Sequence, residues 1–155
     1  MGEAKIIERC VFVPKAVIDA SLASTPFQGK HLLDPLKTLS LKHALSFNIL
    51  EDMDVADNVC EIHAVDKDLW IGVEGEMVFT VGGELVDPWI AKKPDGTEGD
   101  PRELRAKQIR GGTEIVVRPG DRLEIPPGVA HTHARFPGKA RAEIIKVPEI
   151  SRVKV

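Results

Sequence analysis

The chain has 155 residues, 43% of them hydrophobic and 29% charged, which is typical of one compact globular domain with a sizeable core. Its 21 Lys and Arg residues against 24 Asp and Glu residues give a net charge of −3, so the sequence carries no basic footprint for nucleic acid or an anionic membrane. No apolar run approaches the roughly 20 residues of a membrane span, and no signal-peptide pattern opens the chain. We therefore expect a cytoplasmic protein with neither nucleic-acid nor membrane partners.

The first third of the chain mixes strand and helix signals. Residues 5–13 are rich in β-branched side chains and predict a strand, and Pro14 then opens a short helical segment over residues 15–23. Residues 44–50 form the better strand candidate of a Leu-dense stretch, and residues 52–58 predict a turn-rich break. The strand-rich core is expected over about residues 44–147, with residues 1–43 as an N-terminal extension of a single domain, 1–155.

The segment 59–65 alternates polar and apolar side chains with the period of a strand. Glu61 and His63 share one face, whereas Cys60 and Ile62 share the other. The two cysteines of the chain, Cys10 and Cys60, lack the spacing of a disulfide framework or a metal finger, so we predict reduced thiols with Cys60 buried.

Further strands and turns follow. Residues 69–81 predict a hairpin that turns through Gly75, and residues 92–101 an exposed loop that is a candidate lid. Strand character returns over residues 109–117, 123–125 and 140–147. Many short strands between Gly and Pro turns predict an all-β fold, an antiparallel barrel or sandwich.

Two motifs narrow this fold class. In the later one, Gly120, Pro126, Gly128 and His131 match the spacing Gly, five residues, Pro, one residue, Gly, two residues, His; only the final Asn of the pattern is replaced, by Arg135. This segment resembles the second conserved motif of the cupin superfamily. The resemblance implies a cupin-type antiparallel β-barrel, or jelly roll.

The earlier segment resembles the first cupin motif in a degenerate form. Alignment on Gly75 places Asp68 at the family's acidic position, His63 at the second histidine and Glu61 at the first. One histidine of two is retained, and Asp replaces Glu. Together the motifs cover about half of the chain. The family's fold supports many unrelated reactions, so the resemblance does not select one.

Four residues are predicted metal ligands: His63, His131, Glu61 and Asp68. Two imidazoles with a carboxylate and open positions suit a divalent ion, here Fe, Mn, Ni or Zn. Glu61 shares a strand face with His63, whereas Asp68 occupies a position that ligates metal in the family. Which carboxylate binds is left open, and each of the four has an alternative as an ordinary packed or solvated side chain.

His133 and Arg135 continue the alternation from His131 and are predicted catalytic residues. His133 would serve as a general base or an extra ligand, and Arg135 would clamp a substrate carboxylate or phosphate. A bulge after Gly128 would instead direct both side chains to solvent. Trp70, Met77 and Phe79 are predicted to line the substrate pocket, with a place in the core as the alternative.

The sequence thus predicts a cupin with one divalent metal ion and a small polar ligand, either an organic acid or a sugar-like compound. If it is an enzyme, dioxygenase and isomerase chemistry are both compatible with the resemblance. The alternative is a non-catalytic binding or structural module, which the degenerate first motif favours. A homodimer is expected, because cupins commonly pair and the N-terminal strand could extend a neighbour's sheet.

Overall fold

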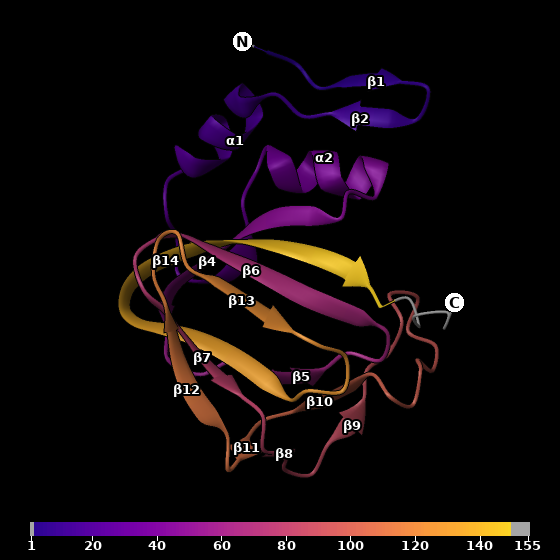
Figure 1. Ribbon diagram of the computed structural model, residues 1–155, viewed down its shortest axis with the longest axis vertical. Coiled ribbons are helices and arrows are strands. Elements are labelled where there is room, and N and C mark those ends of the chain that lie inside the picture. Colours follow the sequence, from indigo (N-terminus) through magenta and orange to yellow (C-terminus); the bar gives the residue numbers. More distant parts are fainter. Residues whose placement is uncertain (1, 150–155) are drawn as a thin grey trace, which may run out of the picture.

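The computed structural model describes residues 2–149 as two antiparallel β layers with a small helical layer on one side (Figure 1). Residue 1 and residues 150–155, the outermost ends of the predicted domain, lie outside the described part. The predicted all-β class is confirmed, because the described residues form mostly antiparallel strands and only two short helices.

The first layer contains five strands. Their spatial order is β3 (Gly29–Leu32), β4 (Phe47–Val55), β14 (His131–Pro148), β6 (Asp66–Glu74) and β13 (Arg122–Ile125). Because β3 pairs with β4, the sheet includes residues that the sequence assigned to an N-terminal extension.

The second layer shares β14 with the first. Its order is β12 (Thr113–Val117), β7 (Met77–Val81), β14, β5 (Cys60–Ile62), β10 (Leu104–Ala106) and β9 (Trp89–Ile90). The start of β14 pairs with β7, and its later part lies between β4 and β6. The register shifts between Arg135 and Lys139, where this strand passes from one layer to the other. One long strand therefore joins both layers.

The remaining elements lie outside the two layers. They are the hairpin of β1 (Lys5–Ile7) and β2 (Cys10–Phe12), the helices α1 (Lys15–Leu22) and α2 (Leu36–His43), and the short pair β8 (Glu84–Leu85) and β11 (Ile109–Arg110). Neither helix of residues 2–149 has the length or the apolar stretch that a membrane crossing needs.

The helices cover the outer face of β4. Leu33, Leu36 and Ile49 form a small buried cluster there, against which residues of α1 pack. The sequence analysis did not predict α2, although Leu36 and Ser40 are buried one helical turn apart. The helix ends at Ala44, which adopts the left-handed conformation.

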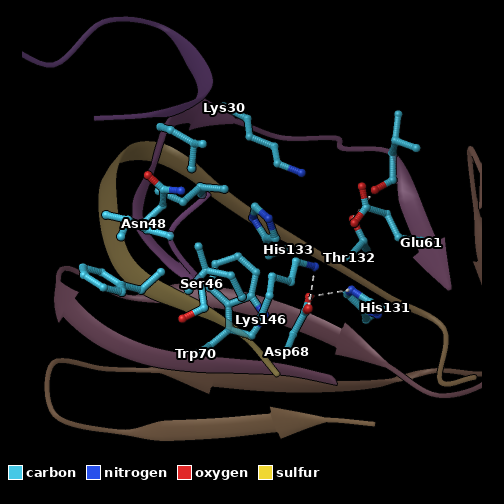
Figure 2. Close-up of a pocket in the computed structure, with 16 residues that line it drawn as sticks. Lys30, Ser46, Asn48, Glu61, Asp68, Trp70, His131, Thr132, His133 and Lys146 are labelled. Atoms are coloured by element: carbon cyan, nitrogen blue, oxygen red, sulfur yellow. Dashed lines mark hydrogen bonds and ion pairs between the residues drawn. The ribbon is translucent and has the colours of Figure 1, made fainter. Parts of the chain in front are cut away.

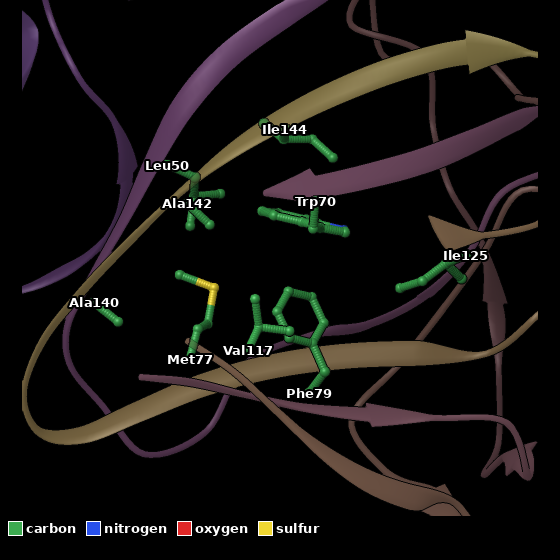
Figure 3. Close-up of a cluster of buried hydrophobic side chains, with 9 residues drawn as sticks. All are labelled: Leu50, Trp70, Met77, Phe79, Val117, Ile125, Ala140, Ala142 and Ile144. Carbon is green, nitrogen blue, oxygen red and sulfur yellow. The ribbon is translucent and has the colours of Figure 1, made fainter. Parts of the chain in front are cut away.

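The main core fills the space between the two layers (Figure 3). It consists of Leu50, Trp70, Met77, Phe79, Val117, Ile125, Ala140, Ala142 and Ile144. Alternate residues of β7 and β14 supply much of it, as the two-residue period of a strand requires, and β4 and β6 add Leu50 and Trp70. Charged residues that share this inward face lie farther along the same strands and form the site described below.

Three local predictions were wrong. Residues 69–81 do not form a hairpin, because β6 pairs with β13 and β14 whereas β7 pairs with β12 and β14. The bend at Gly75 is thus a corner between layers. The predicted break at residues 52–58 is strand as far as Val55, since pairing with β14 overrides the weak strand propensity of aspartate. The predicted strand 59–65 forms ladder pairs only over Cys60–Ile62.

Candidate metal centre

His63 and His131 lie side by side at one end of the space between the layers. His131 is the first residue of β14 and pairs directly with Glu61 of β5, and His63 follows the end of that strand. The two ring centroids are 5.1 Å apart. One potential ligand atom from each of these three residues lies within 4.8 Å of the other two. The fold therefore brings the two predicted histidines to a common point.

The Nδ1 atom of each imidazole, which is the nitrogen farther from Asp68, lies beside a hydrogen-bond acceptor. His131 Nδ1 lies 3.0 Å from the carbonyl oxygen of Val129, and His63 Nδ1 lies 3.3 Å from Glu103 Oε2. Glu103 is itself fixed by the backbone N–H of Ala64, which donates to its other oxygen at 2.7 Å. In the neutral tautomer that carries its proton on Nδ1, each ring satisfies its acceptor and leaves the lone pair of Nε2 able to coordinate a metal ion. This arrangement is typical of metal-ligating histidines.

Asp68 lies between the two Nε2 atoms. Its Oδ2 atom is 3.3 Å from His63 Nε2 and 3.5 Å from His131 Nε2, and the residue is only 1% exposed. Burial alone would raise the pKa of this carboxyl group. The adjacent imidazoles of His131 and His63 and the ammonium group of Lys146 outweigh burial, and the pKa lies far below its usual range. Asp68 is therefore an ionised, fully buried carboxylate.

Glu61 provides the second carboxylate, nearer to solvent. Its Oε2 atom is 3.5 Å from His63 Nε2, and its Oε1 atom is 3.5 Å from Arg105 Nε. Burial acts to raise the pKa of Glu61, but the positive charges of Lys30 and Arg105 outweigh it and lower the pKa. The structure thus brings all four predicted ligands together, and it places both carboxylates beside the imidazoles.

Lys146 is a member of this group that the sequence analysis missed. Its Nζ atom donates to Asp68 Oδ1 at 2.5 Å and to His63 Nε2 at 2.9 Å. Residues 142, 144 and 146 alternate inward along β14, as the burial of Ala142 and Ile144 shows. A lysine at the third of these positions was the available signal.

A cavity of about 220 Å³ opens beside the carboxylates (Figure 2). Its apolar walls include Leu32, Phe47, Trp70 and Ile144, and its polar lining includes Ser46, Asn48, Thr132, Glu61, Asp68, His131 and His133. The ammonium groups of Lys30 and Lys146 also face it. No residue of the exposed loop 92–101, the candidate lid, belongs to this lining among the described residues.

His133 is buried against the cavity and is not turned to solvent. Its Nδ1 atom lies 2.6 Å from Asp52 Oδ2, and both residues are at most 3% exposed. Burial lowers the pKa of His133, and the neighbouring Asp52 only partly offsets that effect. Asp52 was missed because the sequence placed it in a turn, whereas it occupies the inward face of β4.

The other predicted site residues lie in three different places: along the cavity, in the core and at the bend of β14. Trp70 lines the cavity and also packs against Phe79 and His133, with ring centroids 5.1 Å away in each case. Met77 and Phe79 lie in the core and not along this cavity. Arg135 pairs with Val55 where β14 bends between layers, also outside the cavity lining. The guanidinium of Arg135 lies instead beside Gly138, at the bend of β14.

The donor atoms fit a divalent cation. Two inward imidazole nitrogens and two ionised carboxylates match the borderline ions Fe, Mn, Ni and Zn better than a soft ion that prefers sulfur. Both cysteines are free, and Cys60 is buried as predicted, away from these donors. A cation here would also compensate the charge of Asp68, whose contacts among residues 2–149 include Lys146 and the two imidazoles.

Comparisons with known proteins identify structures of similar fold but no relative by sequence. No family model matches the chain, and neither does any curated protein. A cupin protein from Bacteroides fragilis is 13% identical, with a TM-score of 0.47, covering 85% of this chain and 86% of that one. The Drosophila melanogaster CENP-C cupin domain is 12% identical, with a TM-score of 0.45, covering 66% of this chain and 60% of that one.

A third similar structure is hydroxypropylphosphonic acid epoxidase from S. wedmorenis, described in complex with fosfomycin. It is 13% identical, with a TM-score of 0.41, over 65% of this chain and 42% of that one. The chain likewise spans 49% of peruvianin-I, a cysteine peptidase from Thevetia peruviana latex. It therefore corresponds to less than two thirds of several of these proteins, and the similarity concerns the fold alone.

Proposed function

We propose that this cupin holds one divalent metal ion through His63 and His131, completed by Glu61, Asp68 or both, and that it binds a small organic acid in the adjoining cavity. The observation that carries the proposal is the pair of Nε2 atoms that face Asp68 while each Nδ1 is engaged by an acceptor.

Charge in the cavity favours an anionic ligand over a neutral sugar-like one. Lys30, from β3, projects to the cavity and forms no ion pair within residues 2–149. The apolar walls of Leu32 and Trp70 in the same cavity suit the hydrocarbon part of a small acid. An ammonium group with no carboxylate at ion-pair distance among the described residues is available to a carboxylate of the ligand.

The catalytic form of the proposal is a dioxygenase or an isomerase. A bound metal ion would supply Lewis acidity or a redox centre beside the ligand. In both cases His133 moves the proton: its Nδ1 proton is held by Asp52, which leaves Nε2 as the nitrogen that accepts. Trp70 fixes the imidazole from one side and excludes water from it.

A metal-free binding module is the second candidate, and one contact favours it. The ammonium group of Lys146 already compensates Asp68 and occupies His63 Nε2. A protein that had lost its metal would need such a cation in its place. The cavity and Lys30 would then still bind an anion.

Metal content distinguishes the two candidates. Protein purified without chelators is analysed for first-row metals, together with His131→Ala, Glu61→Ala and the control His43→Ala, which lies on α2 away from the site. We expect near-stoichiometric metal in the parent and the control, and a loss of most of it in His131→Ala and Glu61→Ala. A metal-free parent would instead support the binding module.

A further inference from the structure

We propose that Lys146 is an internal cation that takes the place of the metal ion in the metal-free protein and must leave it when metal binds. The inference rests on the proposed function, because it concerns the same ligands. It adds a residue that sets metal affinity, and it links the metal to the organic acid.

The first step is the register between two strands. Lys146 of β14 lies directly opposite Asp68 of β6, and its backbone N–H is fixed by a hydrogen bond of 2.7 Å to the carbonyl oxygen of Ser46. From this fixed base the side chain reaches Asp68 Oδ1 at 2.5 Å and His63 Nε2 at 2.9 Å. The ammonium group therefore lies among the donor atoms that would hold a metal (Figure 2).

His63 Nε2 cannot accept a hydrogen bond from Lys146 and coordinate a metal ion at the same time. An unprotonated imidazole nitrogen has a single lone pair in the ring plane. When the ammonium group of Lys146 donates a hydrogen bond to His63 Nε2, that lone pair is used and cannot coordinate a metal ion. The hydrogen bond and metal ligation by His63 are therefore mutually exclusive.

Lys146 is the residue of this group whose side chain can move when a metal ion binds. The side chains of Asp68 and His63 are 2% and 10% exposed, whereas that of Lys146 is 42% exposed. The lysine has a flexible four-carbon stem, and its charged end can return to water at little cost. The carboxylate and the imidazole stay in place, and the ammonium group withdraws.

A consequence for the ligand follows. Lys146 lines the same cavity as Lys30, so its released ammonium group faces the cavity as a second cation. Metal binding then increases the affinity for an organic acid, and by thermodynamic linkage the acid increases the affinity for metal by the same factor. In the metal-free protein, Lys146 is held by Asp68 and only Lys30 is available.

The test compares Lys146→Met, which keeps the apolar stem but removes the charge and the donor, with Lys30→Met. Lys30→Met removes a charge from the same cavity, and Lys30 makes no hydrogen bond or ion pair with a predicted metal ligand. Binding of Co²⁺ alone is measured by calorimetry at one fixed pH, and metal-free thermal unfolding is recorded. We expect Lys146→Met to bind Co²⁺ at least tenfold more tightly than the parent, with a much smaller change in Lys30→Met.

We also expect a lower unfolding midpoint for metal-free Lys146→Met, because Asp68 loses its counter-charge. Lys146→Gln replaces the Met variant if that protein does not fold.

The outcomes separate this inference from the proposed function. Equal or weaker Co²⁺ binding by Lys146→Met than by the parent overturns the inference and leaves the metal site standing. Binding by Lys146→Met but not by the parent supports the inference and rejects metal binding as the parent's function. If no variant and no parent bind Co²⁺, both are rejected.

Discussion

At the scale of residues, the site depends on what holds each imidazole from behind. The Val129 carbonyl group and the Glu103 carboxylate contact the two Nδ1 atoms and thereby orient each ring with its Nε2 toward Asp68. Glu103 comes from a segment far from both motifs, and it also binds the backbone of Ala64 next to His63. Such outer contacts orient a ligand as effectively as its own strand does.

Glu103→Ala tests this contact. Without the carboxylate, His63 loses the acceptor that fixes its ring, and we expect metal affinity to fall about 10- to 100-fold. Glu98→Ala, in the exposed loop before it, is the control and should bind metal as the parent does. Calorimetric titration measures both, and an unchanged affinity in Glu103→Ala would show that β5 alone orients the ring.

At the scale of elements, β14 joins the two layers, and the turn at Gly75 allows the chain to pass from β6 in one layer to β7 in the other. Gly75 has φ +64°, and a Cβ atom there would lie only 2.3 Å from the carbonyl oxygen of Lys139, on the bend of β14. The close approach allows β6 to turn into the other layer beside β14. The glycine that aligned the first motif is thus required for a crossing and not for a hairpin.

Gly75→Ala should therefore be more destabilising than an ordinary glycine replacement at positive φ. Gly82 has φ +77°, and a Cβ atom added there would meet nothing within 4 Å, so Gly82→Ala isolates the cost of the conformation. We expect about 1 kcal/mol for Gly82→Ala and about 3 kcal/mol for Gly75→Ala, where a collision with backbone is added. Urea unfolding of both variants gives the difference, and equal losses would mean that the corner relaxes freely.

At the scale of the whole molecule, buried ionic groups tie the N-terminal region to the barrel. Arg141 of β14 pairs with Glu51 of β4 at 2.5 Å and also donates to the carbonyl oxygens of Leu22 and Ser24 at the end of α1. Arg141 and Glu51 are at most 2% exposed. The homodimer stays a prediction, for which the exposed apolar residues Ile6 and Phe12 of the N-terminal hairpin provide a candidate surface.

The stability of the whole fold should depend on pH through Glu143. Burial raises the pKa of this carboxyl group above 4.5, so its favourable contribution is present below that pH and is lost as the pH rises through the higher folded value. Glu143→Gln removes the charge, and we expect it to unfold at a higher denaturant concentration than the parent at pH 7. Below pH 4.5 the two proteins should become equal, and a pH-independent difference would contradict this assignment.

The sequence by itself determined the fold class and the four predicted ligands, because turn glycines, prolines and strand alternation are local properties. His63, His131, Glu61 and Asp68 could be named from spacing and the motif resemblance, and the structure brings them together. The same local rules failed for the hairpin at residues 69–81, since pairing partners are not encoded by alternation.

Only the tertiary structure decided what surrounds those ligands. Lys146 meets Asp68, and Asp52 meets His133, through contacts that span 78 and 81 positions of the chain. Such contacts depend on the register of β14 against β6 and on its bend between the layers. A shift of one residue would turn Lys146 to the opposite face, so its role follows from strand pairing and not from its place in the sequence.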